Sequence, residues 1–442
     1  MEFFKNKRVV FSLILGGLII SPAAADTNQV VEIAMGLDTV WVLLGAFLVF
    51  FMQAGFGMVE AGFIRAKNST NILTKNFLDF CMASIGFFVF GYAIMFGKGN
   101  GFLGWSGFAM VGAESGADVP LFAFWLFQAA FCGAAATIVA GGMAERMKFK
   151  AYLVYSFLIS AFIYPIVGHW VWGGGWLSAL NFTDFAGSAV VHTTGGVAAL
   201  IGTIILKPRT GKYRPDGSVK MIAGHNIPLA SLGVFILWFG WFGFNAGSTL
   251  SVGDGSLISL VAINTNLAAA AGGILAMIVV WGTTGKPDLS MALNGALAGL
   301  VAVTAPCAFI SPLSAIIIGS VGGILVVLVS LLLDRLKIDD PVGAFPVHGV
   351  NGIWGTLALG LFGRQSLGLT SEGLFFGGGF SQLGVQALGV FTIATFVIVA
   401  MGIIFLIIDK TIGLRASVDE ENIGLDIGEH GLESYSGFQI IE

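Results

Sequence analysis

Two histidines occupy equivalent positions in a motif that occurs twice, and their chemistry makes them the first candidates for a functional role. Residues 184–196 read DFAGSAVVHTTGG and residues 340–352 read DPVGAFPVHGVNG, so an aspartate, a glycine, a histidine and a second glycine recur in register. His192 and His348 are therefore predicted to lie at the same place in two copies of one unit. Two imidazoles can share a proton, take a proton from a ligand or hydrogen-bond a small neutral molecule. They leave a zinc tetrahedron unfilled, so no metal is expected.

The aspartates that open the motif predict where the histidines lie. Asp184 and Asp340 suit helix N-caps and Pro341 suits the first helical position, so each histidine should lie eight residues inside a helix. That is about 12 Å of rise, near the middle of a hydrocarbon core about 30 Å thick. If the helices enter from opposite faces, as in an inverted repeat, the histidines meet near one axis. Asp184 has an alternative role, which is to attract cations to the pore mouth.

Composition places the chain among all-α polytopic membrane proteins. Of its residues 56% are hydrophobic and only 10% charged, and its 64 glycines favour close helix packing. We expect no soluble domain of useful size, and eleven spans, ten of them in a five-plus-five inverted repeat. The spans fall at about residues 37–63, 72–96, 121–143, 151–172, 185–206, 229–250, 257–282, 289–306, 312–333, 341–362 and 383–409.

The first residues have the form of a secretory signal peptide. Residues 1–25 carry a basic start, an apolar run and three alanines, so cleavage is expected after Ala25. The alternative is a short first membrane helix, for which the apolar run is too short. The remaining chain divides into a transmembrane domain at residues 26–409 and a tail at residues 410–442. Three cysteines without paired spacing are expected to be small core residues, namely Cys81, Cys132 and Cys307.

The basic residues predict the orientation of the chain in a plasma membrane, the inner membrane of a bacterium. With residue 26 outside, 16 of the 18 Lys and Arg residues after the signal peptide face the cytoplasm, and only Lys98 and Arg364 face outward. The span with His192 then runs inward and the span with His348 runs outward, which supports two antiparallel copies. The acidic tail at 410–442 is cytoplasmic, and we expect it to be weakly ordered alone and available to a partner.

Three carboxylates near the predicted cytoplasmic ends of spans each lie close to a basic residue in the sequence. Because an isolated charge in a membrane is costly, local ion pairing is the expected role for all three. The carboxylates are Glu60, Asp79 and Glu145, and the basic residues are Arg65, Lys75 and Arg146.

Aromatic side chains near the predicted outer ends of spans have two possible roles. Trp172 precedes a run of three glycines, where it can anchor the chain at the membrane interface or hold a small cation over its ring face. Phe131 and Phe244 are expected to pack in the core on composition alone. Ser248 can accept a hydrogen bond from a polyatomic cation or bond back to its own helix.

Several motifs together resemble the ammonium transporter and Rhesus (Amt/Rh) family. They are HWVWGGGW with DFAGSAVVH, AERMKF at 144–149, GWFGFNAGS at 240–248 and DDPVGAFPVHGVNGIWG at 339–355. The resemblance extends from about residue 37 to 435 in the order and spacing of the family. MQAGFGMVEAGFIRAKN, with Gln53 and Glu60, is similar to its cyanobacterial, archaeal and plant-like branch. Gly343 stands where some members have an acidic residue.

The resemblance implies an architecture and a set of site residues. The architecture is a homotrimer of eleven-helix subunits with one pore per subunit and a pseudo-twofold between spans 1–5 and 6–10. The resemblance assigns Trp172, Ser248 and Phe131 to an outer vestibule, Phe131 and Phe244 to a stacked gate, His192 and His348 to the pore, and Asp184 to supporting the vestibule. Residues 423–435, IGLDIGEHGLESY, resemble the segment that contacts a trimeric PII-type signal protein.

The predicted function is ammonium transport for nitrogen uptake. An ammonium ion pays a large desolvation penalty in an apolar pore, whereas ammonia loses only hydrogen bonds. We therefore expect capture at the vestibule, deprotonation near the phenylalanines and passage of ammonia along the histidines, with or without its proton. The alternatives are an ammonium sensor that signals through its tail and a Rhesus-like channel for other neutral gases. An enzyme is the weakest reading, and neither a cofactor nor nucleic acid is expected.

Overall fold

Long apolar helices dominate the structure, a computed structural model that describes residues 27–435. The expected signal peptide at 1–25 lies outside this range. Within it there are helices and isolated bridges but no strands. The α-helices are α2 (Thr27–Phe63), α3 (Ser69–Gly86), α4 (Tyr92–Phe96), α5 (Leu121–Met143), α6 (Phe149–Leu158), α7 (Tyr164–Val171), α8 (Trp176–Ala179), α9 (Thr194–Leu206), α10 (Ile227–Asn245), α11 (Gly255–Thr284), α12 (Leu289–Thr304), α13 (Pro312–Arg335), α14 (Asn351–Phe362), α15 (Ser381–Thr411) and α16 (Val418–Ile423).

Short segments of other helical types connect or extend these helices. The π-helices are η2 (Phe87–Gly91), η4 (Ile159–Ile163), η5 (Ser188–Thr193), η7 (Phe345–Val350) and η10 (Asp426–His430). The 3₁₀-helices are η1 (Ala66–Asn68), η3 (Phe108–Met110), η6 (Ala246–Thr249), η8 (Gln365–Leu367) and η9 (Leu374–Phe376).

The all-α membrane class is confirmed, because 9 helical stretches within residues 27–435 are long and apolar enough to cross a membrane. The remaining two expected spans coincide with α12, which has 16 residues, and with η7 followed by α14. The helix α12 is short for a hydrocarbon core about 30 Å thick, and η7 with α14, residues 345–362, is not among the 9 candidate spans. The number eleven therefore stays a prediction.

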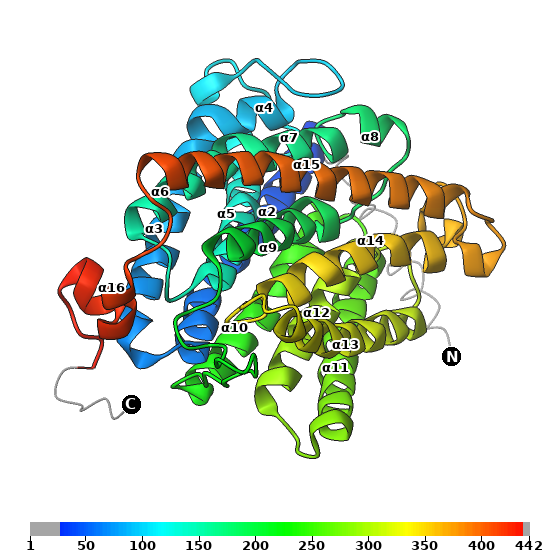
Figure 1. Ribbon diagram of the computed structural model, residues 1–442. Coiled ribbons are helices and arrows are strands. Elements are labelled where there is room, and N and C mark those ends of the chain that lie inside the picture. The colour runs from blue at the N-terminus through cyan, green and yellow to red at the C-terminus, as the bar shows by residue number, and fades with distance from the viewer. Residues whose placement is uncertain (1–26, 436–442) are drawn as a thin grey trace, which may run out of the picture.

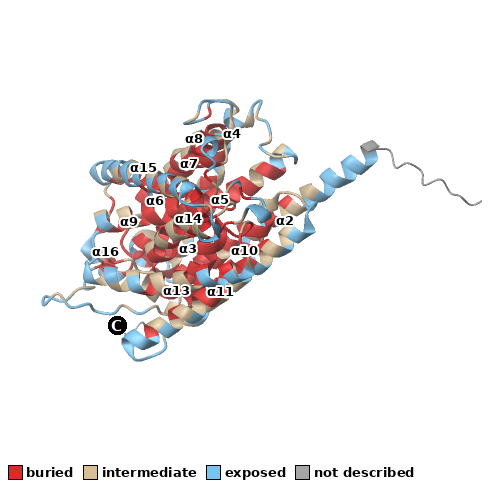
Figure 2. Cartoon of the chain, turned by 90° about the vertical axis from the view of Figure 1, so that its right-hand side faces the viewer, coloured by how far each residue is buried: buried red, intermediate tan, exposed pale blue. Residues whose placement is uncertain are grey.

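The helices pack around a centre of buried side chains. Figure 2 shows the buried residues gathered in the middle of the bundle, while the first turns of α2 project from it and are exposed. The helix α5 is the most enclosed of the candidate spans, with 83% of its apolar window buried. Helices α2 and α10 approach closely through small residues, because a Cβ on Gly233 would lie 2.7 Å from the Gly55 carbonyl oxygen.

The described part of the C-terminal tail is docked on the bundle, whereas the expectation of weak order concerned the tail alone and stays a prediction. Figure 1 shows α15 crossing the bundle and leading to α16, which lies against one end of it. We call this the tail end and the other the vestibule end. Arg415 donates to the carbonyl oxygens of Leu206 and Pro208 at 2.7 and 2.9 Å. The Asp426 carboxylate accepts the N–H groups of Thr70 and Asn71 at the start of α3.

The prediction for the cysteines is confirmed in two of three cases. Cys132 and Cys307 are buried, as expected of small core residues. Cys81 is exposed on α3, so the prediction is wrong there. A helix that faces lipid has apolar residues on its outer side too, and hydrophobicity alone does not separate the two faces.

Candidate functional site

The two motif aspartates hold the starts of two helices in the same way. The Asp184 carboxylate accepts four backbone N–H groups, those of Gly187, Ser188, Ala189 and Val190, at 2.8–3.0 Å. The Asp340 carboxylate accepts those of Gly343, Ala344 and Phe345 at 2.8–3.0 Å. In each copy a left-handed glycine, with φ of 117° at Gly187 and 81° at Gly343, turns the chain so that the carboxylate lies beneath these groups.

This geometry corrects the predicted helix starts. The helices begin after the glycine turns, at Ser188 and Ala344, and Pro341 lies before the helix instead of at its first position. His192 and His348 therefore lie in the opening π-helical segments η5 and η7, not eight residues inside α-helices. The carboxylates still accept the N–H groups at the helix starts, but each aspartate lies before the glycine turn instead of directly before the helix.

The two histidines are in direct contact inside the bundle. Their Nδ1 atoms lie 3.2 Å apart, with the ring centroids 5.2 Å apart and the rings tilted by 22°. Both side chains are buried. One Nδ1 must donate and the other accept, so the pair holds one hydrogen between two rings. The other ring nitrogen of His192, Nε2, is buried and has no hydrogen-bond partner within residues 27–435.

A glycine contact allows the histidines to meet. A Cβ on Gly196, one turn after His192, would lie 2.1 Å from the Gly349 nitrogen, next to His348. Only a glycine leaves space for two backbones at this distance. The two copies of the motif are thus joined by their backbones as well as by their imidazoles.

An aromatic stack covers the histidine pair. Phe131 of α5 and Phe244 of α10 stack with centroids 4.0 Å apart and rings at 26°. Phe244 is followed by His192 at 5.4 Å, and His192 stacks on Trp241 at 5.1 Å and 17°. Sequence analysis did not single out Trp241, although it precedes Phe244 by three residues, the spacing that puts two residues on one helix face.

A cavity of about 320 Å³ lies on the far side of the stack, at the vestibule end. Its lining includes all three predicted vestibule residues, and Gln128 and Phe185 are among the lining residues that were not predicted. The lining residues that matter here are Phe131, Trp172, Ser248, Gln128 and Phe185.

The polar atoms of the predicted vestibule residues are partly engaged. The Trp172 indole N–H donates to the Asp184 carbonyl oxygen at 2.8 Å, and its ring lies edge-on to Phe131 at 6.3 Å. The Ser248 hydroxyl donates to the Phe244 carbonyl oxygen at 2.7 Å, which is the back-bonding alternative. Its lone pairs stay available as acceptors, and the Trp172 ring face contributes through its π-electrons.

A second, narrow cavity of about 20 Å³ lies on the other side of the histidines, toward the tail end. His348, Phe56, Glu60 and Asn294 are among its lining residues. The Phe131–Phe244 stack and the histidine pair thus separate two cavities. We call this second space the inner cavity.

The three carboxylates expected to form local ion pairs are placed differently. Glu60 accepts a hydrogen bond from Asn76 at 2.9 Å, and Asp79 accepts one from Thr137 at 2.8 Å. The predicted ion pairing is therefore wrong for Glu60 and Asp79. Lys75 instead donates to the Met147 carbonyl oxygen at 2.6 Å.

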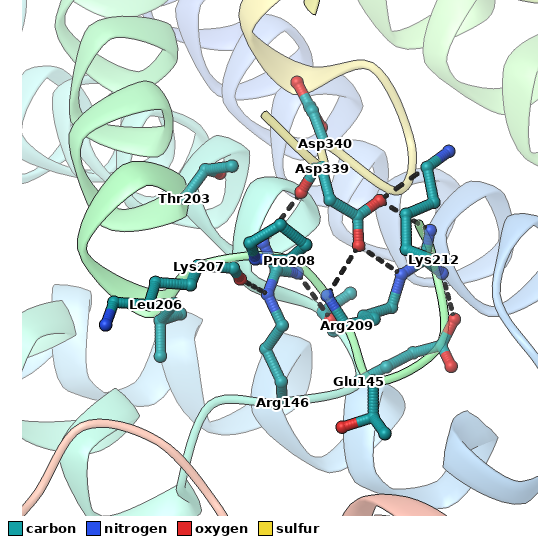
Figure 3. A network of polar contacts seen from close by, with 12 residues as sticks. Glu145, Arg146, Thr203, Leu206, Lys207, Pro208, Arg209, Lys212, Asp339 and Asp340 are labelled. Atoms are coloured by element: carbon teal, nitrogen blue, oxygen red, sulfur yellow. Dashed lines mark hydrogen bonds and ion pairs between the residues drawn. The ribbon is translucent and has the colours of Figure 1, made fainter. Parts of the chain in front are cut away.

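Glu145 does form ion pairs, but with the distant Arg65 and Arg209 instead of its predicted neighbour Arg146. It contacts Arg65 and Arg209, both at 2.5 Å. Figure 3 shows Arg209 between Glu145 and Asp339, with which it makes a two-pronged pair at 2.8 and 2.9 Å. Although burial opposes ionisation, the Arg209 guanidinium holds the pKa of Asp339 well below its usual range. Asp339 adjoins Asp340, so this network reaches the start of the helix that carries His348.

Arg146 is bound by backbone oxygens instead of Glu145. Its guanidinium donates to the carbonyl oxygens of Ala144, Lys207 and Asp339 (Figure 3). Burial lowers its pKa to about 10, so it stays charged at neutral pH. Within residues 27–435 no group of three or more His, Cys, Asp or Glu side chains could hold a metal ion.

Comparisons with known proteins agree with this geometry. A family model described as Ammonium Transporter Family matches residues 40–435. Among curated relatives, the chain is 45% identical to ammonium transporter Amt2 of Archaeoglobus fulgidus, over 98% of this chain and 97% of that protein. It is 38% identical to an ammonium transporter of Bacillus subtilis, over 90% and 98%.

Solved structures show the same fold. A Sensor Amt Protein superposes with a TM-score of 0.85 and 41% identity, over 90% of this chain and 99% of that one. Mep2 of Candida albicans superposes with a TM-score of 0.80 and 32% identity, over 87% of both chains. Since the family model covers nearly the whole described range, this chain belongs to the Ammonium Transporter Family.

Proposed function

We propose that this protein transports ammonium across a membrane and passes it through the bundle as ammonia. The observation that carries the proposal is the order of elements along one line. A cavity with an aromatic lining ends at the stacked Phe131 and Phe244, and the contacting pair of His192 and His348 follows. The relatives named as ammonium transporters support the identification of ammonium as the substrate.

Capture of the ion takes place at Trp172 and Ser248. With its N–H held by the Asp184 carbonyl, the Trp172 indole presents a ring face that attracts a small cation by about 0.5–2 kcal/mol. The Ser248 hydroxyl accepts an N–H of the ion, because its own hydrogen is committed to Phe244. Potassium has no proton to give up, so the deprotonation that follows capture favours ammonium over it.

The phenylalanine stack excludes the charged form. Phe131 and Phe244 are both buried and offer no oxygen to replace the hydration shell of an ion. Ammonia loses only its hydrogen bonds on entering the same space. The ion therefore gives up its proton near the stack, and ammonia moves on to the unpartnered Nε2 of His192 and then along the pair to the inner cavity.

The basic residues support a proposed orientation, and the family resemblance supports a proposed assembly. The distribution of Lys and Arg puts the vestibule end outside and the tail end in the cytoplasm, in the plasma membrane or bacterial inner membrane. We propose a homotrimer with one pore per subunit. The docked tail, residues 412–435 of the 410–442 segment, presents a surface for a PII-type signal protein.

Uptake of labelled ammonium into liposomes tests this function. The protein, reconstituted in liposomes on a solid-supported membrane, should give uptake of labelled ammonium above protein-free liposomes after an ammonium jump. The double variant His192→Ala with His348→Ala should lose that uptake. Thr395→Val, an exposed α15 position whose hydroxyl bonds only to its own helix, is the control and should not. No uptake by the wild type would refute transport.

A second candidate function is ammonium sensing. The superposition on a Sensor Amt Protein favours it, and the tail is joined to the bundle by hydrogen bonds at Thr210 and Thr70. A sensor would bind ammonium and change the protection of the tail without uptake. Hydrogen exchange of residues 412–435 with and without ammonium, measured beside uptake, separates the two.

A further inference from the structure

A set of membrane-buried polar side chains lies beside the pore and has no role in the transport path described above. They lie where α2, α3, α5 and η4 pack together, and all are buried except Gln53, which is partly buried. We call them the polar column, and its members are Gln53, Glu60, Asn76, Asp79, Thr137 and Ser160. The geometry of the polar column does not depend on the proposed function, but the role that we assign to it below rests on that function.

The geometry around Thr137 accommodates both protonation states of Asp79. The Thr137 hydroxyl lies within 2.8–2.9 Å of three oxygens, those of Asp79, Gln53 and the Gly133 backbone, and it has one hydrogen to give. Turning the Gln53 amide over satisfies one contact, and it also gives Nε2, otherwise without a partner, an acceptor. The hydroxyl hydrogen can then go to the Asp79 carboxylate or to the Gly133 carbonyl, which a regular α-helix already pairs with the Thr137 N–H. In the first case Asp79 is ionised and accepts, and in the second it donates to the hydroxyl as a neutral carboxylic acid.

The column has a second rung nearer the tail end. Glu60 lies two turns after Gln53 on α2, and Asn76 lies one turn before Asp79 on α3, so each pair shares a helix face. Asn76 donates to Glu60 at 2.9 Å. Glu60 also lines the inner cavity together with His348. The column therefore ends in the space where ammonia leaves the histidines.

Several column atoms are buried without a partner within residues 27–435. They are Gln53 Nε2, Asn76 Oδ1, Asp79 Oδ1 and Ser160 Oγ. Buried polar atoms normally have hydrogen-bond partners. An internal water molecule can be such a partner where two to four polar groups surround it. Toward the vestibule end, Gln128 Oε1 is also without a partner and lines the vestibule cavity.

We propose that Asp79 is a proton-binding site and that the polar column carries the proton released from ammonium, apart from the ammonia that passes the histidines. Ammonium splits at the vestibule into ammonia and a proton. Asp79 gives its proton toward Asn76 and Glu60 and takes up the released one, so its own O–H bond is broken and remade. Glu60 then protonates ammonia in the inner cavity. One positive charge moves for each ammonium.

The ratio of charge to substrate tests the proposal. Liposomes on a solid-supported membrane should give current and labelled-ammonium uptake for the wild type. Asp79→Asn keeps the shape and hydrogen-bonding capacity but cannot exchange a proton, so we expect at least about tenfold less current with uptake within about twofold. Glu60→Gln should behave alike and carries the test if Asp79→Asn does not fold.

A pair of threonine variants separates proton transfer from packing. Thr137→Val removes the hydroxyl that contacts Asp79 and should lower the current. Thr356→Val removes another buried hydroxyl that bonds only to its own helix and should not. Unchanged current in Asp79→Asn, equal loss of current and uptake, or wild-type uptake without current would each overturn the column. Wild-type liposomes without uptake would instead overturn the proposed function.

Discussion

The Gly196 and Gly349 backbones touch at the point where the two copies of the histidine motif meet, since a Cβ on Gly196 would lie 2.1 Å from the Gly349 nitrogen. The Nδ1 contact of His192 and His348 depends on this approach. The position of the imidazole pair is thus set by main-chain packing between the two halves of the chain.

Gly196→Ala should therefore abolish uptake while leaving both histidines in the chain. The added methyl group would push η7 away from α9 and break the 3.2 Å contact, and overpacking costs about 1–3 kcal/mol. Uptake and thermal unfolding in detergent measure the two effects. Gly384→Ala on α15, where nothing lies within 4 Å, is the matched control and should unfold at the same or a higher temperature. Normal uptake in Gly196→Ala would show that the histidine contact is not needed.

Asp184→Asn should destabilise the protein strongly for a change of one atom. An amide has one oxygen, so it cannot accept all four N–H groups that the carboxylate accepts. Leaving two of them buried without a partner costs about 2–5 kcal/mol. Asp254→Asn removes a charge from an exposed N-cap with one acceptor bond and should change stability by less than about 0.5 kcal/mol. Equal shifts in the unfolding temperature of the two variants would contradict this account.

Arg209→Ala should loosen the tail end more than the loss of any exposed arginine. It leaves the Glu145 and Asp339 carboxylates buried with fewer positive partners, at a cost of about 3–5 kcal/mol. Arg209→Lys restores the charge but not the two-pronged contact, so its stability should be intermediate. Arg214→Ala, exposed and bonded within its own turn, is the control. The unfolding temperatures rank the three variants. A wild-type unfolding temperature for Arg209→Ala would show that the ion-pair network does not stabilise the protein.

Acidification should release the end of the tail. Burial, and then the charge of Lys75, lowers the pKa of His430, whose Nε2 lies 3.0 Å from the Asn71 amide nitrogen and can accept its hydrogen only when unprotonated. Because the folded-state pKa is below the usual value of about 6.5, this stabilisation is present above that pH and is lost as the pH falls through the lower, folded value. Hydrogen exchange of residues 423–435 between pH 7 and 5 would show the release. His430→Gln should make the exchange protection of this segment nearly independent of pH.

Much of the fold and site follows from patterns that the sequence repeats. The duplicated motif predicts the meeting of His192 and His348, because equal spacing from a capping aspartate puts them at equal depth. It does not predict the glycine turn that delays each helix. That turn depends on φ values of 117° and 81°, which the letters Gly187 and Gly343 permit but do not require.

The partners of buried charged side chains could not be predicted from their neighbours in the sequence. Lys75 is one helical turn from Asp79 on α3, yet its flexible side chain extends to the Met147 carbonyl oxygen, in the segment between α5 and α6. Asp79 is met by Thr137, and Glu145 by Arg209, from segments 58 and 64 residues away. Such pairs result from helix packing, which one sequence does not encode locally. The contact between the tail and the bundle is another such case, because the Asp426 carboxylate accepts the N–H groups of Thr70 and Asn71 at the distant start of α3.

Asp184 joins two parts of the molecule at a single residue. Its carboxylate fastens the beginning of the His192 helix, and its carbonyl oxygen holds the Trp172 indole. The Trp172 ring, which we propose receives the ion, and the helix that carries His192 are therefore fastened to the same residue. Substrate entry cannot be timed by sliding one against the other. On the route we propose, the Phe131 and Phe244 rings would have to move, and rotation about their side-chain bonds takes place on the timescale of rotamer changes and not of helix motion.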